Sequence, residues 1–251
     1  MPATIPASTP VVVEPGIDSE KRLNQSFAEA CSLDAGDDQL PPPAITIAGK
    51  STGVLREAVE KAWPIISLIG DDGKPRGWTF VIATDLGDIE IELRPTIAPN
   101  HVRNLIALVK TGYYDGLRFD RIVRQAGELP DGTPVRLEMV RFGCPAGTGD
   151  PGIGHLGYHL KSEFSDAKHE PGTVGFVRDD DPSSGGVRLY ITTAACPILD
   201  GNLTVVGQVA RGMEVVQRIA GGEILPPDAD PSREMPVRPV VIRKATVQAS
   251  R

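Results

Sequence analysis

Short strand-forming runs recur at regular spacing over the last two thirds of the chain, and no other feature constrains the fold as strongly. The clearest run spans 88–94, where Ile89, Ile91 and Leu93 alternate with charged residues directly after the turn residues of 85–88. A period of two is typical of a strand with one buried and one wet face, here the second strand of a hairpin. Further runs lie at 79–83, 119–123, 137–143, 172–178, 187–193, 203–209 and 240–247.

Only two segments among these runs have helical spacing. Pro99 suits the first position of a helix, and an apolar face then continues until Gly112 ends it. Residues 212–219 form a second, shorter helix, and a polar stretch at 124–134 predicts a loop. Together these patterns predict a mainly β fold, a closed antiparallel β-barrel of about eight strands capped by two helices, because closure leaves no unpaired strand edge.

The first 74 residues have a different character and predict an extension to the barrel. Residues 1–16 are rich in Pro, Thr, Ala and Val, which is typical of a flexible tail. The stronger of two helical patterns spans 52–63 and stops at Pro64. We therefore expect an N-terminal extension over 1–74, with one or two helices of which at least one is docked, and a barrel domain over 75–251.

Composition and charge narrow the partners and the compartment. The net charge of −7 over 251 residues argues against nucleic acid as the main partner. No apolar run approaches the roughly 20 residues that span a bilayer, and the first residues do not resemble a signal peptide. Cys31, Cys144 and Cys196 are isolated and odd in number, which suggests reduced thiols. We expect a cytoplasmic monomer without a membrane span.

Two other patterns mimic cofactor or metal motifs. A G-x-G-x-x-G pattern spans 147–152, but no strand directly precedes it and no crossover helix follows. His155, His159 and Glu163 have the spacing of metal ligands on a helix, yet the glycines between them disfavour a helix. We expect no cofactor and no metal site.

A single arginine stands in the strand-forming run at 119–123. Alternation places Phe119 on the same side as Arg121, with Asp120 and Ile122 on the other side. A guanidinium on a cleft-facing side requires acceptors, because burying an unpaired charge is costly. The acceptor is either a carboxylate in a structural ion pair or the carbonyl of a bound substrate, and the residues alone leave both open.

Residues from roughly 79 to 247 resemble the cyclophilins, a family of barrel-forming peptidyl-prolyl isomerases. The matching segments occur in the family's order and are TFVIATDLGDIEIELRP, APNHVRNLIALVKTGYYDGLRFDRIV, GTGDPGIG, KSEF, SDAKHEPGTVGF and SSGGVRLYITTAACPILDGNLTVVGQVARGMEVVQRI. Their combination is specific, whereas no single segment would suffice. The resemblance implies the barrel fold and catalysis of rotation about X-Pro peptide bonds.

Taken residue by residue, the resemblance implies a catalytic role for Arg121 and a substrate-binding role for nine other residues. The apolar positions that match the family's proline pocket are Met139, Val177, Tyr190 and Leu199. The positions that depart from the family's pattern are Arg141 and Arg188 in place of glutamines, Ile198 in place of an aromatic residue and Leu203 in place of a histidine. Phe119, beside Arg121, completes the set. Without the resemblance, Met139 and Tyr190 fit plain core filling, and Arg141 fits an ion pair equally well.

Rotation about an X-Pro bond needs no nucleophile, metal or cofactor. The barrier of ~18–20 kcal/mol comes from amide resonance, and a guanidinium that fits the twisted bond better than the planar one lowers it. We therefore predict a peptidyl-prolyl cis-trans isomerase that acts on proline-containing polypeptides and assists their folding. The alternative, suggested by the altered polar rim, is a catalytically weak cyclophilin-fold module that binds such peptides as an interaction or holding domain.

Overall fold

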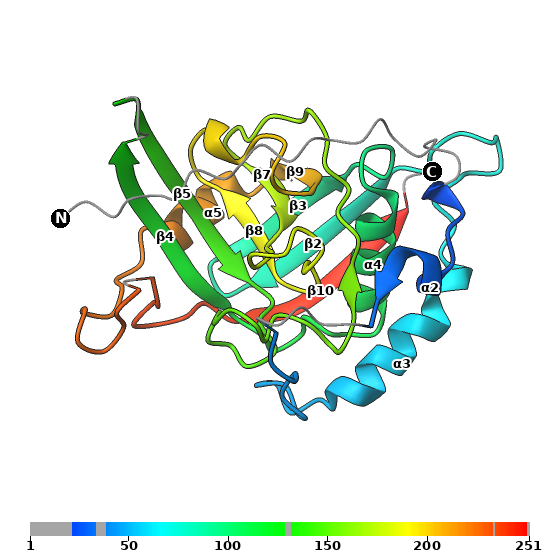
Figure 1. The fold of residues 1–251 in the computed structure, drawn as a ribbon, viewed down its shortest axis with the longest axis horizontal. Helices are drawn as coiled ribbons and strands as arrows, with labels where there is room; N and C mark the ends of the chain where they lie inside the picture. The colour runs from blue at the N-terminus through cyan, green and yellow to red at the C-terminus, as the bar shows by residue number, and fades with distance from the viewer. Residues whose placement is uncertain (1–21, 34–38, 129–131, 233, 250–251) are drawn as a thin grey trace.

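The computed structural model describes residues 22–33, 39–128, 132–232 and 234–249. Its main feature is one eight-stranded sheet in the order β10-β2-β3-β9-β7-β8-β5-β4, with every neighbouring pair antiparallel (Figure 1). The strands are β2 (Trp78–Thr84), β3 (Gly87–Leu93), β4 (Phe119–Glu128), β5 (Pro134–Phe142), β7 (Thr173–Phe176), β8 (Leu189–Thr192), β9 (Val205–Arg211) and β10 (Ile242–Ala249).

Backbone hydrogen bonds join the two ends of this sheet. The amide of Phe119, at the start of β4, donates to the carbonyl of Val240 at 2.9 Å. The amide of Ile242, at the start of β10, donates to the carbonyl of Leu117 at 2.8 Å. These bonds close the sheet into the predicted antiparallel barrel and satisfy backbone groups that an open edge would expose.

The hairpin of β4 and β5 is longer than the sequence predicts. Residues 124–128 and Pro134, which were expected to belong to a loop, instead extend the two strands, and the described pairing continues to Glu128 opposite Pro134. The end of the hairpin projects beyond the other strands (Figure 1). The prediction of a loop was wrong because strand pairing supplies the backbone hydrogen bonds even where neither face of the ribbon is buried.

Both predicted helices of the barrel domain are present, as α4 (Pro99–Lys110) and α5 (Met213–Ala220). The residue before α4 is Ala98, whose methyl side chain cannot accept a hydrogen bond from the first turn of the helix. The buried carboxylate of Glu163 does so instead, since it accepts from the backbone amides of Asn100 at 3.2 Å and His101 at 3.0 Å. A carboxylate at this position also interacts favourably with the positive end of the helix dipole.

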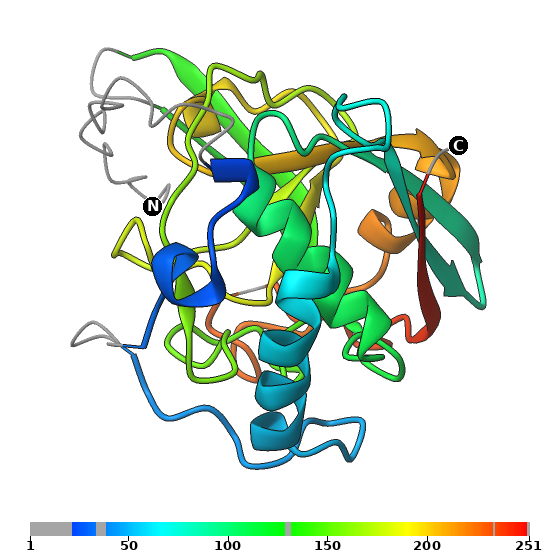
Figure 2. The ribbon, with the colours of Figure 1, turned by 90° about the vertical axis from the view of Figure 1, so that its right-hand side faces the viewer.

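The N-terminal segment packs on the outside of α4. Its stronger helical pattern is α3 (Thr52–Ala62), which continues into the 3₁₀ helix η1 (Trp63–Ile65) and lies beside α4 (Figure 2). The weaker pattern yields α2 (Phe27–Ala30), followed by β1 (Cys31–Ser32), which pairs with β6 (His159–Leu160). The predicted flexible tail at 1–16 lies outside the described residues.

Residues 40–47, before α3, run alongside the glycine-containing loop at 145–155. The amide of Leu40 donates to the carbonyl of Gly152 at 2.8 Å, and the amide of Ile47 donates to the carbonyl of Pro145 at 2.7 Å. The N-terminal segment therefore supports a loop of the barrel as well as α4.

Candidate active site

An apolar pocket lies beside the main core, on strands β5 and β8 and on the residues that directly follow β7. It has a volume of about 180 Å³, which suits one small side chain. The lining residues are Leu137, Met139, Arg141, Val177, Arg178, Tyr190, Leu199 and Leu203. Of the residues predicted to bind substrate, the pocket thus brings together Met139, Arg141, Val177, Tyr190, Leu199 and Leu203.

Strand alternation explains this gathering. On β5, Leu137, Met139 and Arg141 line the pocket, whereas Val140 and Phe142 between and beyond them belong to the barrel core. The antiparallel register places Arg141 directly opposite Tyr190 of β8. Leu199 comes from the short 3₁₀ helix η2 (Pro197–Leu199), which closes one side of the pocket.

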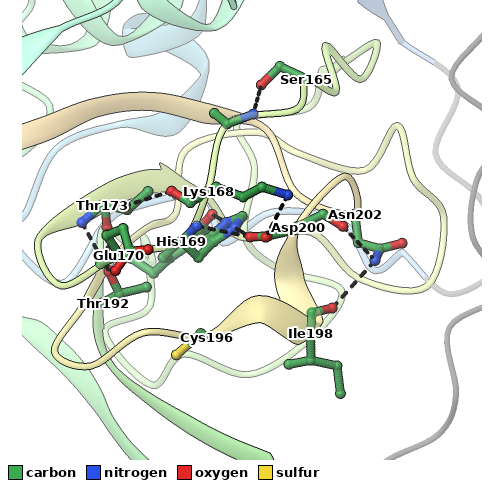
Figure 3. Close-up of polar contacts among 12 residues, drawn as sticks. Ser165, Lys168, His169, Glu170, Thr173, Thr192, Cys196, Ile198, Asp200 and Asn202 are labelled. Carbon is green, nitrogen blue, oxygen red and sulfur yellow. Dashed lines mark hydrogen bonds and ion pairs between the residues drawn. The ribbon is translucent and has the colours of Figure 1, made fainter.

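A chain of polar contacts holds Tyr190 in place. Its hydroxyl lies 2.7 Å from Nε2 of His169, and Nδ1 of His169 lies 3.0 Å from Oδ1 of Asp200. Because a carboxylate only accepts, Nδ1 carries the proton and Nε2 accepts from the tyrosine. Burial lowers the pKa of His169, which keeps the ring neutral. Figure 3 shows His169 and Lys168 both directed at Asp200, with the Lys168 ammonium 3.2 Å from it.

Arg121 lies on β4, directly opposite Arg141 of β5, but it does not line the pocket. Only 6% of the residue is exposed. Its guanidinium forms ion pairs with Asp150 at 2.7 Å and with Asp230 at 3.5 Å, and it donates to the hydroxyl of Ser232. Of the two acceptors that the sequence left open for Arg121, the structure shows the carboxylates of structural ion pairs.

Three predicted residues lie elsewhere. A register shift between Phe119 and Arg121 turns Phe119 into the barrel core, against Phe142, so the expectation that it shares a side with Arg121 was wrong. Arg188 is buried and binds Asp179 and two carbonyls of the glycine loop. Ile198 lines a separate cavity of about 590 Å³ that is also lined by residues 133–136, near the turn end of the β4–β5 hairpin.

Several residues of the site were not predicted. Leu137 belongs to the same alternating series as Met139, so the period of β5 could have identified it. Arg178 directly follows Val177 in the sequence. His169, Asp200 and Asp230 carried no signal, because their roles depend on contacts between segments far apart in the chain.

No metal centre or membrane helix is found among the described residues. In the parts of the chain that the structure describes, no three His, Cys, Asp or Glu side chains are grouped so as to hold a metal ion. Within the same residues, no helix is long and apolar enough to cross a bilayer.

Asp120 is buried next to the site and provides a test by pH. It is 2% exposed, and burial raises the pKa of its carboxyl from 3.8 to about 7. A raised acid pKa stabilises the folded protein below pH 4, and this contribution is lost as pH rises through 7, because the folded state must then hold a buried charge. We expect Asp120→Asn to raise the free energy of unfolding by roughly 2–4 kcal/mol at pH 8 and little at pH 4.

Urea unfolding of both proteins at several pH values measures this difference. Asp88→Asn, at an exposed position of β3, is the control and should show no such trend. If the free energies of unfolding of wild type and Asp120→Asn differ by the same amount at every pH, the raised pKa of Asp120 is contradicted.

The fold and the site together define a closed β-barrel protein with a small, largely apolar pocket beside guanidinium groups. Its family follows from comparison with known proteins, since the family model described as "Cyclophilin type peptidyl-prolyl cis-trans isomerase/CLD" matches residues 79–247. A "Probable peptidyl-prolyl cis-trans isomerase" of Brucella suis is 32% identical over 176 residues, which cover 68% of this chain and 83% of that protein. The chain belongs to the cyclophilin-type peptidyl-prolyl cis-trans isomerase family.

Two further similarities agree with this membership. The Homo sapiens "Peptidylprolyl isomerase domain and WD repeat-containing protein 1" is 30% identical over 164 residues, 65% of this chain and 24% of that protein. The crystal structure of a Cryptosporidium parvum cyclophilin type isomerase, obtained in the presence of the dipeptide Ala-Pro, has a TM-score of 0.56 at 21% identity. That likeness covers 68% of this chain and 99% of the other and supports the barrel fold.

Proposed function

We propose that this protein catalyses cis–trans isomerisation of X-Pro peptide bonds in flexible or unfolded polypeptides. The observation that carries the proposal is the apolar pocket on a cyclophilin barrel, with Arg141 at its edge and Arg121 on the next strand. The pocket accepts the proline ring, as the presence of Ala-Pro with a structural neighbour also suggests.

In this mechanism the pocket fixes the proline while the preceding residue rotates. Met139, Tyr190 and Leu199 contact the ring, and the His169 contact keeps Tyr190 from turning into the space that the ring needs. The X-Pro bond of the bound substrate then requires a hydrogen-bond donor that binds the twisted form of the bond more strongly than the planar form. Such a donor must reach the prolyl nitrogen or the rotating carbonyl.

Arg121 is that donor in the proposal. To bind the substrate, its guanidinium must release one of its two carboxylate partners. Asp230 is buried with it, and Asp230 also accepts from the backbone amides of Glu234 and Met235, so this partner is rigid. Asp150 is exposed and lies on the glycine loop, so this partner can release the guanidinium. We infer that loss of the Asp150 contact precedes each turnover.

Asp150→Asn is expected to raise kcat/KM by about two- to fivefold. The substitution removes the competing charge and leaves the Asp150 backbone carbonyl to accept from Arg188. An ion pair whose carboxylate is exposed to solvent is weakened by screening and contributes about 1 kcal/mol, which sets this range. The measurement is a protease-coupled assay of prolyl isomerisation, with Asp85→Asn, an exposed aspartate paired with Arg243, as control. A lower rate for Asp150→Asn would instead assign that carboxylate a positioning role.

A second candidate function is a holding module that binds proline-containing segments without efficient turnover. The observation that favours it is the engagement of Arg121 by two carboxylates and a hydroxyl. Titration of an Ala-Pro-containing peptide into wild type, together with its isomerisation rate, distinguishes the two. Binding without acceleration supports the module, and acceleration supports the isomerase.

A further inference from the structure

Two arginines stand among the residues that line the proline pocket. Arg141 and Arg178 are half-buried there, and all other lining residues are uncharged. Among the described residues, therefore, the lining of this pocket contains no acidic side chain. The pocket carries two positive charges in a chain whose formal net charge is −7.

The contacts of these two arginines differ from those of their neighbours. Arg121 and Arg188 each bind a carboxylate. In the described part of the chain, Arg141 has one polar contact, from its Nε to Sδ of Met139 at 3.5 Å, and a thioether sulfur is a weak acceptor. Arg178 donates only to neutral carbonyls there, those of Asn202, Asp179 and Asp180.

The carboxylates near these arginines are engaged elsewhere. Asp120 accepts from the backbone of Cys144, Glu234 accepts from Gln125, and Asp179 pairs with Arg188. Asp180 and Asp181 are exposed and, within the described residues, neither forms an ion pair with Arg178. Both pocket arginines therefore keep donors for a group that is absent from the folded chain itself.

We propose that Arg141 and Arg178 select polypeptide segments with an anionic side chain next to the proline. The inference rests on the proposed function, because it requires the proline ring in the same pocket. Each of these half-buried guanidinium groups has lost part of its hydration without forming an ion pair within the described residues, and a substrate anion supplies a paired charge through strong hydrogen bonds.

The same arginines also exclude substrates. Arginine has donors and no acceptor, so a lysine or arginine beside the proline meets like charge that no pocket group offsets. The inference thus concerns both acceptance of anions and rejection of cations, and the ratio between the two is the quantity to measure.

The experiment compares peptides Ala-Ala-X-Pro-Phe and Ala-Ala-Pro-X-Phe with Glu, Gln or Lys at X. Exchange NMR gives kcat/KM for each without a coupling protease. For at least one position of X, we expect the ratio of Glu to Lys to be about tenfold or more in the wild-type protein. We expect Arg141→Gln combined with Arg178→Gln to reduce that ratio to within about twofold of one. Added salt should lower the wild-type ratio, since screening weakens charge recognition.

The control variant is Arg211→Gln, which removes one positive charge from an exposed pair with Glu90 that does not line the pocket. Its Glu-to-Lys ratio should equal that of the wild type. Equal rates for Glu, Gln and Lys in the wild type would overturn this inference and leave the proposed function intact. If the wild type accelerates none of the peptides, the proposed function fails, and the same Glu-to-Lys comparison is then made on Kd, where a ratio near one overturns the inference.

The anion can come from a carboxylate or from a phosphorylated residue. A peptide with phosphoserine at the preferred position distinguishes these sources. A kcat/KM below that of the Glu peptide assigns the site to acidic side chains, and a higher value assigns it to phosphorylated ones. Either result agrees with the proposal only if the double substitution removes the preference.

Discussion

Replacing Arg121 with alanine is expected to lower kcat/KM for prolyl isomerisation by about 100- to 1,000-fold. This is the typical cost of removing one hydrogen-bond donor that acts on the transition state. Binding of the ground-state peptide should change much less, because Met139, Tyr190 and the rest of the pocket remain. Measurement of kcat/KM and of peptide Kd for both proteins tests this. Arg121→Lys should recover little, since an ammonium lacks the fixed fork of a guanidinium.

Arg124→Ala is the matched control, because Arg124 is an exposed arginine of the same strand that, among the described residues, donates to the carbonyl of Gly222 and forms no ion pair. It should retain close to the wild-type rate. The Arg121→Ala variant also leaves Asp230 without a cationic partner, so circular dichroism must establish that it is folded. Equal and negligible rates for wild type and Arg121→Ala would leave the holding module as the function. Equal and substantial rates would show that another donor carries the reaction, for which Arg141, opposite Arg121 on β5, is the candidate.

Replacing Trp63 with alanine is expected to lower the free energy of unfolding by about 3–5 kcal/mol. Trp63 is 2% exposed and belongs to the same core cluster as α4. Its indole Nε1 donates to the carbonyl of Gln25 at 2.9 Å, and the guanidinium of Arg103 lies 5.4 Å from its ring. The substitution therefore removes packing, a hydrogen bond and a cation–π contact together.

Ile65→Ala is the control in the same 3₁₀ helix, because Ile65 is 82% exposed. It should cost no more than about 0.5 kcal/mol. Urea unfolding followed by circular dichroism measures both variants. A small effect of Trp63→Ala on the single unfolding transition would mean that the N-terminal segment unfolds independently of the barrel.

Much of the fold could be predicted because its signals are local. Alternation in 88–94 identified β3, and proline and glycine at the two ends identified α4. The projecting part of the β4–β5 hairpin was missed since its strands lack a buried face and so lack a hydrophobic period. The register shift beside Phe119 was missed because a bulge depends on the pairing partner.

The pocket could be predicted only in part. Resemblance placed Met139, Tyr190 and Leu199 together, and in the structure all three line one cavity. The catalytic role of Arg121 stays a prediction. Neither its carboxylate partners nor the His169 contact of Tyr190 has a local signature, because each joins segments that are separated by many residues.

The sequence by itself determined the barrel, its helices and, through the resemblance, six of the residues that line the apolar pocket. Alternation, capping and turn chemistry act between near neighbours and can be read without coordinates. Tertiary structure alone decided that Arg121 forms ion pairs with two carboxylates, whereas Arg141 and Arg178 form no ion pair within the part of the chain that the structure describes. Charge pairing depends on distance in space, and only the closed barrel brings the loops that carry Asp150 and Asp230 to β4.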